Sequence, residues 1–201
     1  MTLRQQWLFA GAIVGLLAGG LGVGAFVMRD ELFPVDVGSR APSFMARTVD
    51  GSNVVRTLED YRGKVVVLNL WATWCPPCIV EMPSFERLKR AVNDTNLRIV
   101  AVSIDDLVGA DSVARFARGL GLTFDILLDS THRIDRAYQV TGYPETFVIA
   151  KDGTIRKKWI GPADWSSPAN VALIRDLLGH AQVAAGRASP DSAAPTPLRR
   201  R

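Results

Sequence analysis

The sequence predicts an α/β domain whose mixed β-sheet is covered by helices on both faces. Two β-branched runs, 64–70 (KVVVLNL) and 97–104 (LRIVAVSI), have the composition of strands that are buried on both sides. A helical segment follows each run, as the connection between parallel strands requires. Near the C-terminus, Lys151-Asp152-Gly153 separates two more strand-like runs and predicts an antiparallel hairpin. Parallel and antiparallel neighbours together make the predicted sheet a mixed one.

The other elements are predicted from turn residues and helix caps. Asp50-Gly51 lies between two short strands and indicates an N-terminal β-hairpin. Asp129 can cap a helix that runs to about Tyr138, and Gly121 marks the end of another helix. In chain order, the predicted ranges are a hairpin at 43–48 and 54–56, a helix at 110–120, a strand at 124–128, hairpin strands at 146–150 and 154–160, and a helix at 166–178.

A helix from about 75 to 90 follows the first central strand. Pro76 suits its first turn, because the N–H that proline lacks would have no partner within the helix at that position. Pro83 falls inside the helix and cannot donate a hydrogen bond to the carbonyl of Ile79, so a kink is expected. This helix therefore begins at the carboxyl end of a central strand, where reaction sites collect in α/β sheets.

Residues 7–28 form a run of 22 positions without a charged side chain. As a helix, this run would cover about 33 Å, which is enough for a hydrocarbon core of about 30 Å. Arg4 precedes the run, and the bias of positive charge toward the cytoplasm predicts an N-terminus inside and a domain outside. The alternative is a cleaved signal peptide that ends near Val23-Gly24-Ala25. Both interpretations predict export, and export permits disulfides.

The chain is accordingly divided into five segments, and the folded domain is expected in the periplasm or another extracytoplasmic space. The tail is rich in Ala, Pro and Ser and is expected to be disordered, because it has little apolar surface to bury. The predicted segments are a cytoplasmic stub at 1–6, a single-pass anchor in the cytoplasmic (inner) membrane at 7–28, a spacer at 29–37, the domain at 38–180, and the tail at 181–201.

The charge of the predicted domain is balanced. Residues 29–180 carry 19 Lys and Arg and 19 Asp and Glu, so the net charge of +4 comes from the two ends of the chain. A domain without a basic excess is not expected to bind nucleic acid.

Cys75 and Cys78 are the two cysteines of the chain, and they are three positions apart. A zinc site would need about four ligands, but there is no third cysteine, and His132 and His180 are distant in sequence. A purely structural disulfide would close too short a loop to add much stability. Because the pair lies after an apolar strand and before a helix, it indicates dithiol–disulfide chemistry without a metal or another cofactor.

Three segments resemble one family of redox proteins. They are 67–78 (VLNLWATWCPPC), Glu81-Met82-Pro83 and 142–147 (GYPETF). They resemble the thioredoxin superfamily and, within it, the membrane-anchored TlpA/ResA/CcmG-like thiol-disulfide oxidoreductases, over about residues 38–180. The resemblance implies a thioredoxin-like fold with an N-terminal β-hairpin extension.

The resemblance also makes Pro144 a cis-proline that lies beside Cys75. An ordinary trans proline in a turn is the alternative that the residues alone leave open. Because proline has no N–H, a cis-proline here would leave the Tyr143 backbone free to pair with an extended substrate segment. Trp74, which precedes Cys75, is expected to present an apolar docking surface. The predicted substrate contacts are therefore Trp74, Tyr143 and the two prolines between the cysteines, Pro76 and Pro77.

Glu81 is the candidate proton acceptor. It lies three positions after Cys78, on the same helix face, and the resemblance implies a partly buried acid that relays protons there. The alternative is a solvated surface glutamate, which is the usual state of a glutamate on a helix. Thioredoxins place a buried acid six residues before the first cysteine, but that position is Asn69 here and cannot titrate. We therefore expect Glu81 to help deprotonate Cys78.

The predicted activity is the reduction of disulfides in client proteins. Cys75 is expected to attack the client disulfide and Cys78 to resolve the mixed disulfide. Pro76 and Pro77 have no N–H to offer a Cys75 thiolate, so the reduced form gains few hydrogen bonds and the couple is a reductant.

The expected partners are a disulfide-containing client protein, with apocytochrome c as one candidate, and a membrane electron donor of the DsbD/CcdA type. A dedicated cytochrome c maturation reductase of the CcmG type is an alternative. The Pro144–Phe147 segment resembles that branch, and Glu145 departs from general TlpA proteins. Copper handling is a further alternative, because a dithiol can bind Cu(I).

Overall fold

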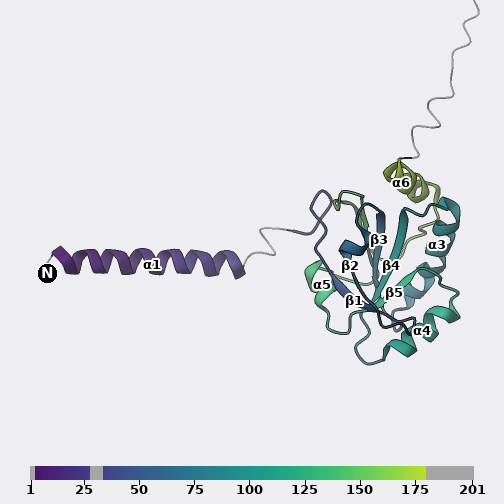
Figure 1. Cartoon of the computed structure of the whole chain (residues 1–201), viewed down its shortest axis with the longest axis horizontal. Coiled ribbons are helices and arrows are strands. Elements are labelled where there is room, and N and C mark those ends of the chain that lie inside the picture. The colour runs from purple at the N-terminus through teal and green to yellow at the C-terminus, as the bar shows by residue number, and fades with distance from the viewer. Residues whose placement is uncertain (1–2, 28–33, 180–201) are drawn as a thin grey trace, which may run out of the picture.

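The computed structural model describes residues 3–27 and 34–179 (Figure 1). Seven strands form a sheet in the order β2-β1-β5-β4-β3-β6-β7. The strands are β1 (Met45–Thr48), β2 (Val55–Thr57), β3 (Val65–Trp71), β4 (Leu97–Ser103), β5 (Asp125–Leu128), β6 (Glu145–Ile149) and β7 (Ile155–Ile160). The helices are α1 (Leu3–Val27), the 3-10 helix η1 (Leu58–Tyr61), α3 (Pro76–Val92), α4 (Ala110–Gly119), α5 (Arg133–Ala137) and α6 (Pro168–Leu178).

The predicted membrane anchor at 7–28 falls on α1. A bilayer crossing needs about 20 consecutive, predominantly apolar residues. Within residues 3–27 and 34–179, no helix combines the length and the apolar character that such a crossing requires.

Strand β3 lies inside the sheet, and all seven of its residues are buried. It runs parallel to β4, from the pair Val65–Leu97 to the pair Trp71–Ser103, and antiparallel to β6. Successive side chains of a strand point to opposite faces of the sheet, so an unbroken apolar run suits a strand that is covered on both faces. The predicted central strand is confirmed, with its range shifted by one residue.

Two apolar clusters fill the two faces of the sheet. Helices α3, α4 and α6 pack on one face, where Phe85 and Ile174 are buried. On the other face, α5, η1 and the segment before β1 contribute Ile134, Tyr61 and Phe44. The expected mixed sheet with helices on both faces is confirmed (Figure 1).

Both predicted hairpins are present at the edges of the sheet. The N-terminal hairpin pairs β1 with β2, and β1 joins the sheet by antiparallel pairing of Arg47 with Leu128 in β5. The second hairpin pairs β6 with β7 and turns through Gly153, whose positive φ of 83° is a conformation that favours glycine. The N-terminal hairpin extension of the predicted fold is therefore confirmed.

Helix α5 is shorter than predicted, because it begins at Arg133 rather than after Asp129. His132 adopts a left-handed conformation with a φ of 55°, which cannot belong to a regular α-helix. The Asp129 carboxylate accepts hydrogen bonds from the backbone N–H groups of Thr131 (3.2 Å) and Ile134 (2.7 Å). Asp129 thus stabilises a turn that leads into the helix.

The packed domain starts before residue 38. Val35, which the sequence analysis placed in the spacer 29–37, is buried in the second apolar cluster. Its N–H donates to Gln139 Oε1 (3.0 Å), and its carbonyl accepts from Lys158 Nζ (3.1 Å). The predicted tail at 181–201 lies outside the described residues. Helix α3 continues as one helix through Pro83, and the expected kink stays a prediction.

We predict that Phe85→Ala lowers the free energy of unfolding of the full chain by about 3–5 kcal/mol. The Phe85 ring is fully buried, stacks on Trp165 with centroids 5.5 Å apart, and meets Phe124 edge-on. Urea unfolding followed by circular dichroism measures the loss. Val80→Ala, at an exposed position of the same helix, is the control and should change stability by only about 0.5 kcal/mol. Equal losses in both variants would contradict this packing.

Candidate functional site

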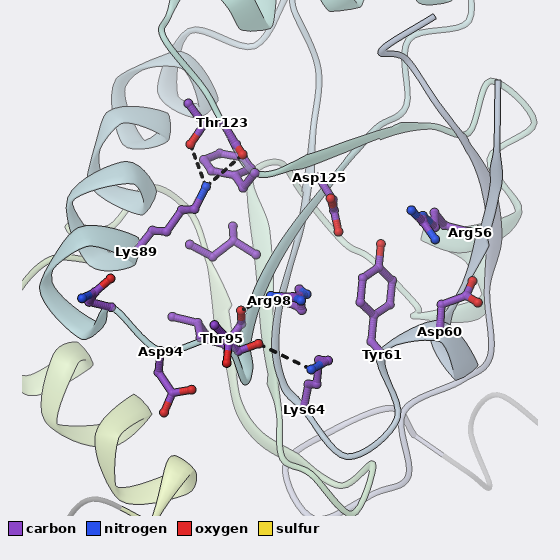
Figure 2. Close-up of a pocket in the computed structure, with 14 residues that line it drawn as sticks. Arg56, Asp60, Tyr61, Lys64, Lys89, Asp94, Thr95, Arg98, Thr123 and Asp125 are labelled. Carbon is purple, nitrogen blue, oxygen red and sulfur yellow. Dashed lines mark hydrogen bonds between the residues drawn. The ribbon is translucent and has the colours of Figure 1, made fainter. Parts of the chain in front are cut away.

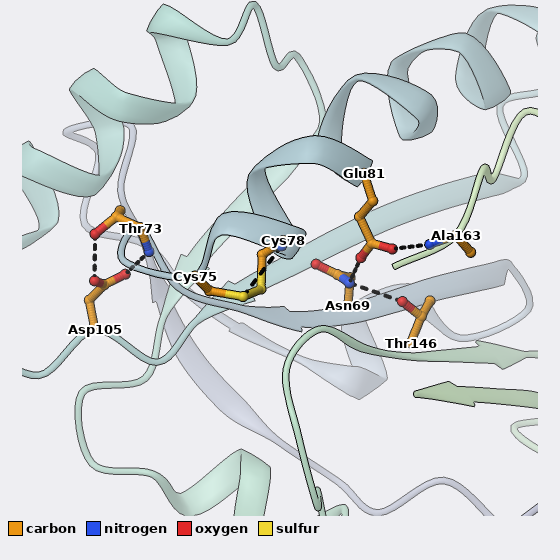
Figure 3. Close-up of a disulfide and its surroundings, with 8 residues drawn as sticks. All are labelled: Asn69, Thr73, Cys75, Cys78, Glu81, Asp105, Thr146 and Ala163. Atoms are coloured by element: carbon orange, nitrogen blue, oxygen red, sulfur yellow. Dashed lines mark hydrogen bonds between the residues drawn. A yellow bond between two sulfur atoms is a disulfide. The ribbon is translucent and has the colours of Figure 1, made fainter. Parts of the chain in front are cut away.

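Cys75 and Cys78 form a disulfide at the start of α3, directly after the carboxyl end of β3 (Figure 3). Cys75 is the N-cap residue of the helix, and its Sγ accepts a hydrogen bond from the backbone N–H of Cys78 (3.3 Å). Cys75 retains 4% exposure, whereas Cys78 is fully buried. The N-terminus of a helix stabilises a thiolate. Cys75 is therefore both the more accessible and the better stabilised sulfur of the pair.

Pro76 and Pro77 occupy the first two positions of α3. Pro76 is exposed and Pro77 is half-buried, so the first turn presents proline rings rather than N–H groups. Within the described residues, the backbone N–H of Cys78 is the hydrogen-bond donor recorded for Cys75 Sγ.

The loop before β6 lies beside this helix start. β6 pairs with β3, and Glu145 is opposite Leu70 near the carboxyl end of β3. The Tyr143–Pro144 peptide bond is cis, so the cis-proline prediction is confirmed. The Pro144 carbonyl accepts a hydrogen bond from the N–H of Gly161 (2.8 Å). Among the described residues, no hydrogen bond engages the backbone N–H or carbonyl of Tyr143.

Trp74 and Tyr143 form an aromatic pair next to the disulfide. Trp74 is 60% exposed, and the two rings meet edge-to-face with centroids 6.2 Å apart. The Tyr143 hydroxyl donates to Asp135 Oδ2 (2.7 Å), which also lies 2.9 Å from His132 Nδ1. Burial, together with the Asp135 carboxylate, raises the pKa of Tyr143 well above its usual value. The hydroxyl therefore stays protonated and anchors the ring that supports Trp74.

Glu81 is a buried acid rather than a solvated one, with 2% exposure (Figure 3). Its Oε2 accepts hydrogen bonds from the backbone N–H of Ala163 (3.0 Å) and from Trp165 Nε1 (3.3 Å). Its Oε1 accepts from Asn69 Nδ2 (2.7 Å). Burial raises the pKa of Glu81 to about 7, although the three hydrogen bonds act in the opposite direction. An acid that titrates near neutrality can take up and release a proton at physiological pH.

Asp105 is a site residue that the sequence analysis missed. It is buried and accepts hydrogen bonds from both the N–H (3.0 Å) and the hydroxyl (2.7 Å) of Thr73, two positions before Cys75 (Figure 3). It therefore holds the connection between β3 and α3. Its place directly after the second central strand was a usable signal, because site residues collect at the carboxyl ends of parallel strands.

Glu145 directly follows the cis-proline and is fully buried. Its Oε2 accepts a hydrogen bond from the backbone N–H of Thr141 (3.0 Å). Lys158 Nζ lies 3.4 Å from Oε1, an ion-pair contact that compensates the buried charge. Glu145 thus fastens both ends of the segment that carries Tyr143 and Pro144.

A half-open cavity of about 530 Å³ lies elsewhere, and no predicted site residue lines it (Figure 2). Leu97 and Asp125, at the amino ends of β4 and β5, line it, so it is at the opposite end of the sheet from the disulfide. The Tyr61 side chain points into it toward Asp125 (Figure 2). Within the described residues, no group of three or more His, Cys, Asp and Glu side chains could hold a metal ion.

Comparison with known proteins gives consistent matches. Residues 37–158 match the AhpC/TSA family. The chain is 36% identical to the thiol-disulfide oxidoreductase ResA of Geobacillus thermodenitrificans, over 78% of this chain and 88% of that protein. It is 35% identical to the thioredoxin-like protein YneN of Bacillus subtilis, over 78% of this chain and 91% of that protein.

A solved structure agrees with these relatives. It is a crystal structure from Chlorobium tepidum, assigned as the thiol:disulfide interchange protein DsbE, with a TM-score of 0.60 and 26% identity over 73% of this chain and 98% of that one. With the Cys75–Cys78 disulfide at the N-terminus of α3, these matches show that the chain belongs to the AhpC/TSA family of thioredoxin-like proteins and is a thiol-disulfide oxidoreductase.

Proposed function

We propose that this enzyme reduces disulfides in client proteins outside the cytoplasm. The observation that carries the proposal is the arrangement of the two sulfurs. Cys75 lies at the helix N-terminus with residual exposure, and Cys78 is buried behind it. The exposed Trp74 ring precedes Cys75 and contacts the Tyr143 ring, and among the described residues no hydrogen bond engages the Tyr143 backbone. An extended client segment can therefore bind beside the reacting sulfur.

In the first step, the Cys75 thiolate attacks one sulfur of the client disulfide. The client S–S bond breaks, a Cys75–client disulfide forms, and the second client sulfur leaves as a thiolate. In the second step, Cys78 loses its proton to Glu81 and attacks Cys75 Sγ. The mixed disulfide breaks, the Cys75–Cys78 disulfide forms, and the first client sulfur leaves as a thiolate. Two electrons pass to the client, whose thiolates take up protons from solvent.

Glu81 suits the role of proton acceptor. It lies one helical turn after Cys78 on the same face of α3, and its pKa of about 7 lies close to neutrality. Asn69 occupies the strand position six residues before Cys75, where thioredoxins carry a buried acid, and it cannot titrate. Glu81 is therefore the acid of the hydrogen-bonded pair that it forms with Asn69.

The direction toward reduction is supported by Pro76 and Pro77. These residues leave the Cys75 sulfur with the Cys78 N–H as its recorded donor. A thiolate with few donors gains little stability over the disulfide, and the couple is then a reductant.

The location outside the cytoplasm is supported by the uncharged run 7–28, because a run of this kind can serve as an export signal. After each cycle the oxidised pair needs two electrons, and we propose a membrane donor of the DsbD/CcdA type.

In intact cells with a permeable outer layer, a thiol reagent that cannot cross the cytoplasmic membrane should label reduced Cys75. Labelling only after lysis would overturn the location.

A dedicated apocytochrome c reductase of the CcmG type is the second candidate. Glu145 favours it, because this fully buried acid departs from general TlpA proteins, and the solved protein assigned as DsbE is similar to this chain.

We predict that Cys75→Ala abolishes turnover and that Cys78→Ala accumulates mixed disulfides with clients. Without Cys75 no thiolate attacks the client, and without Cys78 the mixed disulfide is not resolved. Non-reducing electrophoresis of cells that carry each full-length variant measures the adducts, and mass spectrometry identifies the clients. Adducts confined to an apocytochrome c would select the CcmG type, and several unrelated clients the broader enzyme. Normal turnover in either variant would refute the scheme.

We also predict that the full chain, equilibrated with glutathione, has a potential well below that of a strong oxidant, which is about −120 mV. The fraction of disulfide is measured by alkylation of the free thiols. A value near the strong oxidant would reverse the proposed direction.

Glu81→Gln should remove a pH dependence of stability from the oxidised chain, in which neither cysteine titrates. The pKa of Glu81 is raised from 4.5 to about 7, so the folded chain keeps a proton in this window that the unfolded chain has lost. The free energy of unfolding therefore falls as pH rises from about 4.5 to about 7, by on the order of 3 kcal/mol in total. Urea unfolding of the oxidised wild type and of Glu81→Gln at several pH values measures this fall. The same dependence of the free energy of unfolding on pH in both proteins would contradict the raised pKa of Glu81.

A further inference from the structure

The amide of Asn69 has one satisfied end and one unsatisfied end. Its Nδ2 donates to Glu81 Oε1 (2.7 Å) and to Thr146 Oγ1 (2.9 Å). Its Oδ1 is buried and has no hydrogen-bond partner among the described residues. A buried acceptor without a partner is costly, and native structures contain few of them.

The orientation of this amide follows from its partners. The amide nitrogen donates to Glu81 Oε1, so the amide oxygen faces away from the acid. In Figure 3 the oxygen points toward Cys78. Asn69 lies on the face of β3 that α3 covers, and Glu81, its partner, is one helical turn after Cys78. The unsatisfied oxygen therefore faces the turn of the helix that carries the buried sulfur.

In the oxidised chain, Cys78 Sγ is bonded to Cys75 Sγ and carries no hydrogen. Reduction by two electrons and two protons breaks this bond and gives Cys78 an S–H group, which is a weak donor. Cys75, the disulfide partner of Cys78, and Glu81, the partner of the Asn69 amide, are ionisable groups of this cluster. Glu81 also accepts hydrogen bonds from Ala163 and the Trp165 ring. Lys157 lies on the Trp165 ring, 5.3 Å from its centroid.

We propose that Asn69 is a positioning residue whose Oδ1 accepts a hydrogen bond from the Cys78 thiol when the disulfide is reduced. The oxygen then has a partner in the reduced state and none among the described residues of the oxidised chain, so Asn69 stabilises the dithiol relative to the disulfide. The same bond holds the Cys78 proton at one end of an amide whose other end binds the acceptor Glu81. This proposal rests on the proposed function only in treating Cys78 as the resolving thiol.

The test compares the wild-type full chain with Asn69→Leu, which has a similar volume and no polar atom. Removing the oxygen relieves the oxidised state of an unpaired acceptor and deprives the reduced state of a hydrogen bond. The equilibrium with glutathione should shift about tenfold toward the disulfide, or about 30 mV more negative. The pKa of Cys78, followed by NMR of ¹³C-labelled cysteine, should fall. An unchanged equilibrium and an unchanged pKa would overturn the proposal.

Two matched comparisons separate this role from the bond to Glu81. Thr146→Val removes the other partner of the same amide but leaves its oxygen in place. It should leave the potential unchanged, because this bond involves the amide nitrogen and neither sulfur. Asn69→Leu should also shift the equilibrium in a Glu81→Gln background. Loss of the shift in that background would mean that Asn69 acts through the charge of Glu81, and this would overturn the proposal.

A spectroscopic test needs no change at Asn69. Cys75→Ala leaves Cys78 as the one thiol, so the infrared S–H stretching band reports this group alone. A band at lower frequency than that of a thiol without a hydrogen bond is expected, and a band at the unbonded frequency would overturn the proposal. Wild-type reductase activity, measured in parallel, distinguishes a failure of the proposed function from a failure of the role proposed for Asn69. Its absence would refute the proposed function, and an active wild type with an unshifted Asn69→Leu variant would refute the role of Asn69.

Discussion

Residues 72–75 are all that separates β3 from α3, and this short connection determines where both sulfurs lie. It has little freedom, because β3 is hydrogen-bonded to strands on both sides and α3 packs against its covered face. Cys75 consequently becomes the N-cap of the helix and Cys78 turns inward. The difference in exposure and electrostatics between two identical side chains follows from the strand–helix junction rather than from the cysteines themselves.

Three buried carboxylates fasten the loops around this junction. Each accepts a hydrogen bond from a backbone N–H of a different loop, which satisfies both the acid and a polar group that would otherwise be unpaired. The pairs are Asp105 with Thr73, Glu145 with Thr141, and Glu81 with Ala163. The segment before Cys75, the segment before the cis-proline and the segment after β7 are thus held by side chains from the loop after β4, from β6 and from α3.

Local patterns predicted much of this arrangement. The composition of 64–70 indicated a doubly covered strand, and the cysteine spacing with Pro76 indicated the helix start. The roles of Asp105 and Val35 were missed, because each depends on a contact between distant parts of the chain. The role of Asp135 was missed although its partner Tyr143 is nearby in sequence, because the turn between them had no predicted geometry. The start of α5 was wrong for a local reason, since a capping residue such as Asp129 can also stabilise a turn. The resemblance, rather than the pattern, supplied the cis-proline and the buried acid.

Position 69 holds an amide rather than a second acid, and the short distance between Asn69 and Glu81 explains the benefit of this choice. A carboxyl at position 69 would lie within hydrogen-bond distance of Glu81, and two carboxyls that close cannot both ionise. The Asn69 amide instead donates to Glu81 and opposes the effect of burial on its pKa. With the neutral amide there, one carboxyl changes charge beside the sulfurs, and it titrates near neutrality. The non-titrating strand residue thus keeps the helix acid usable as a base.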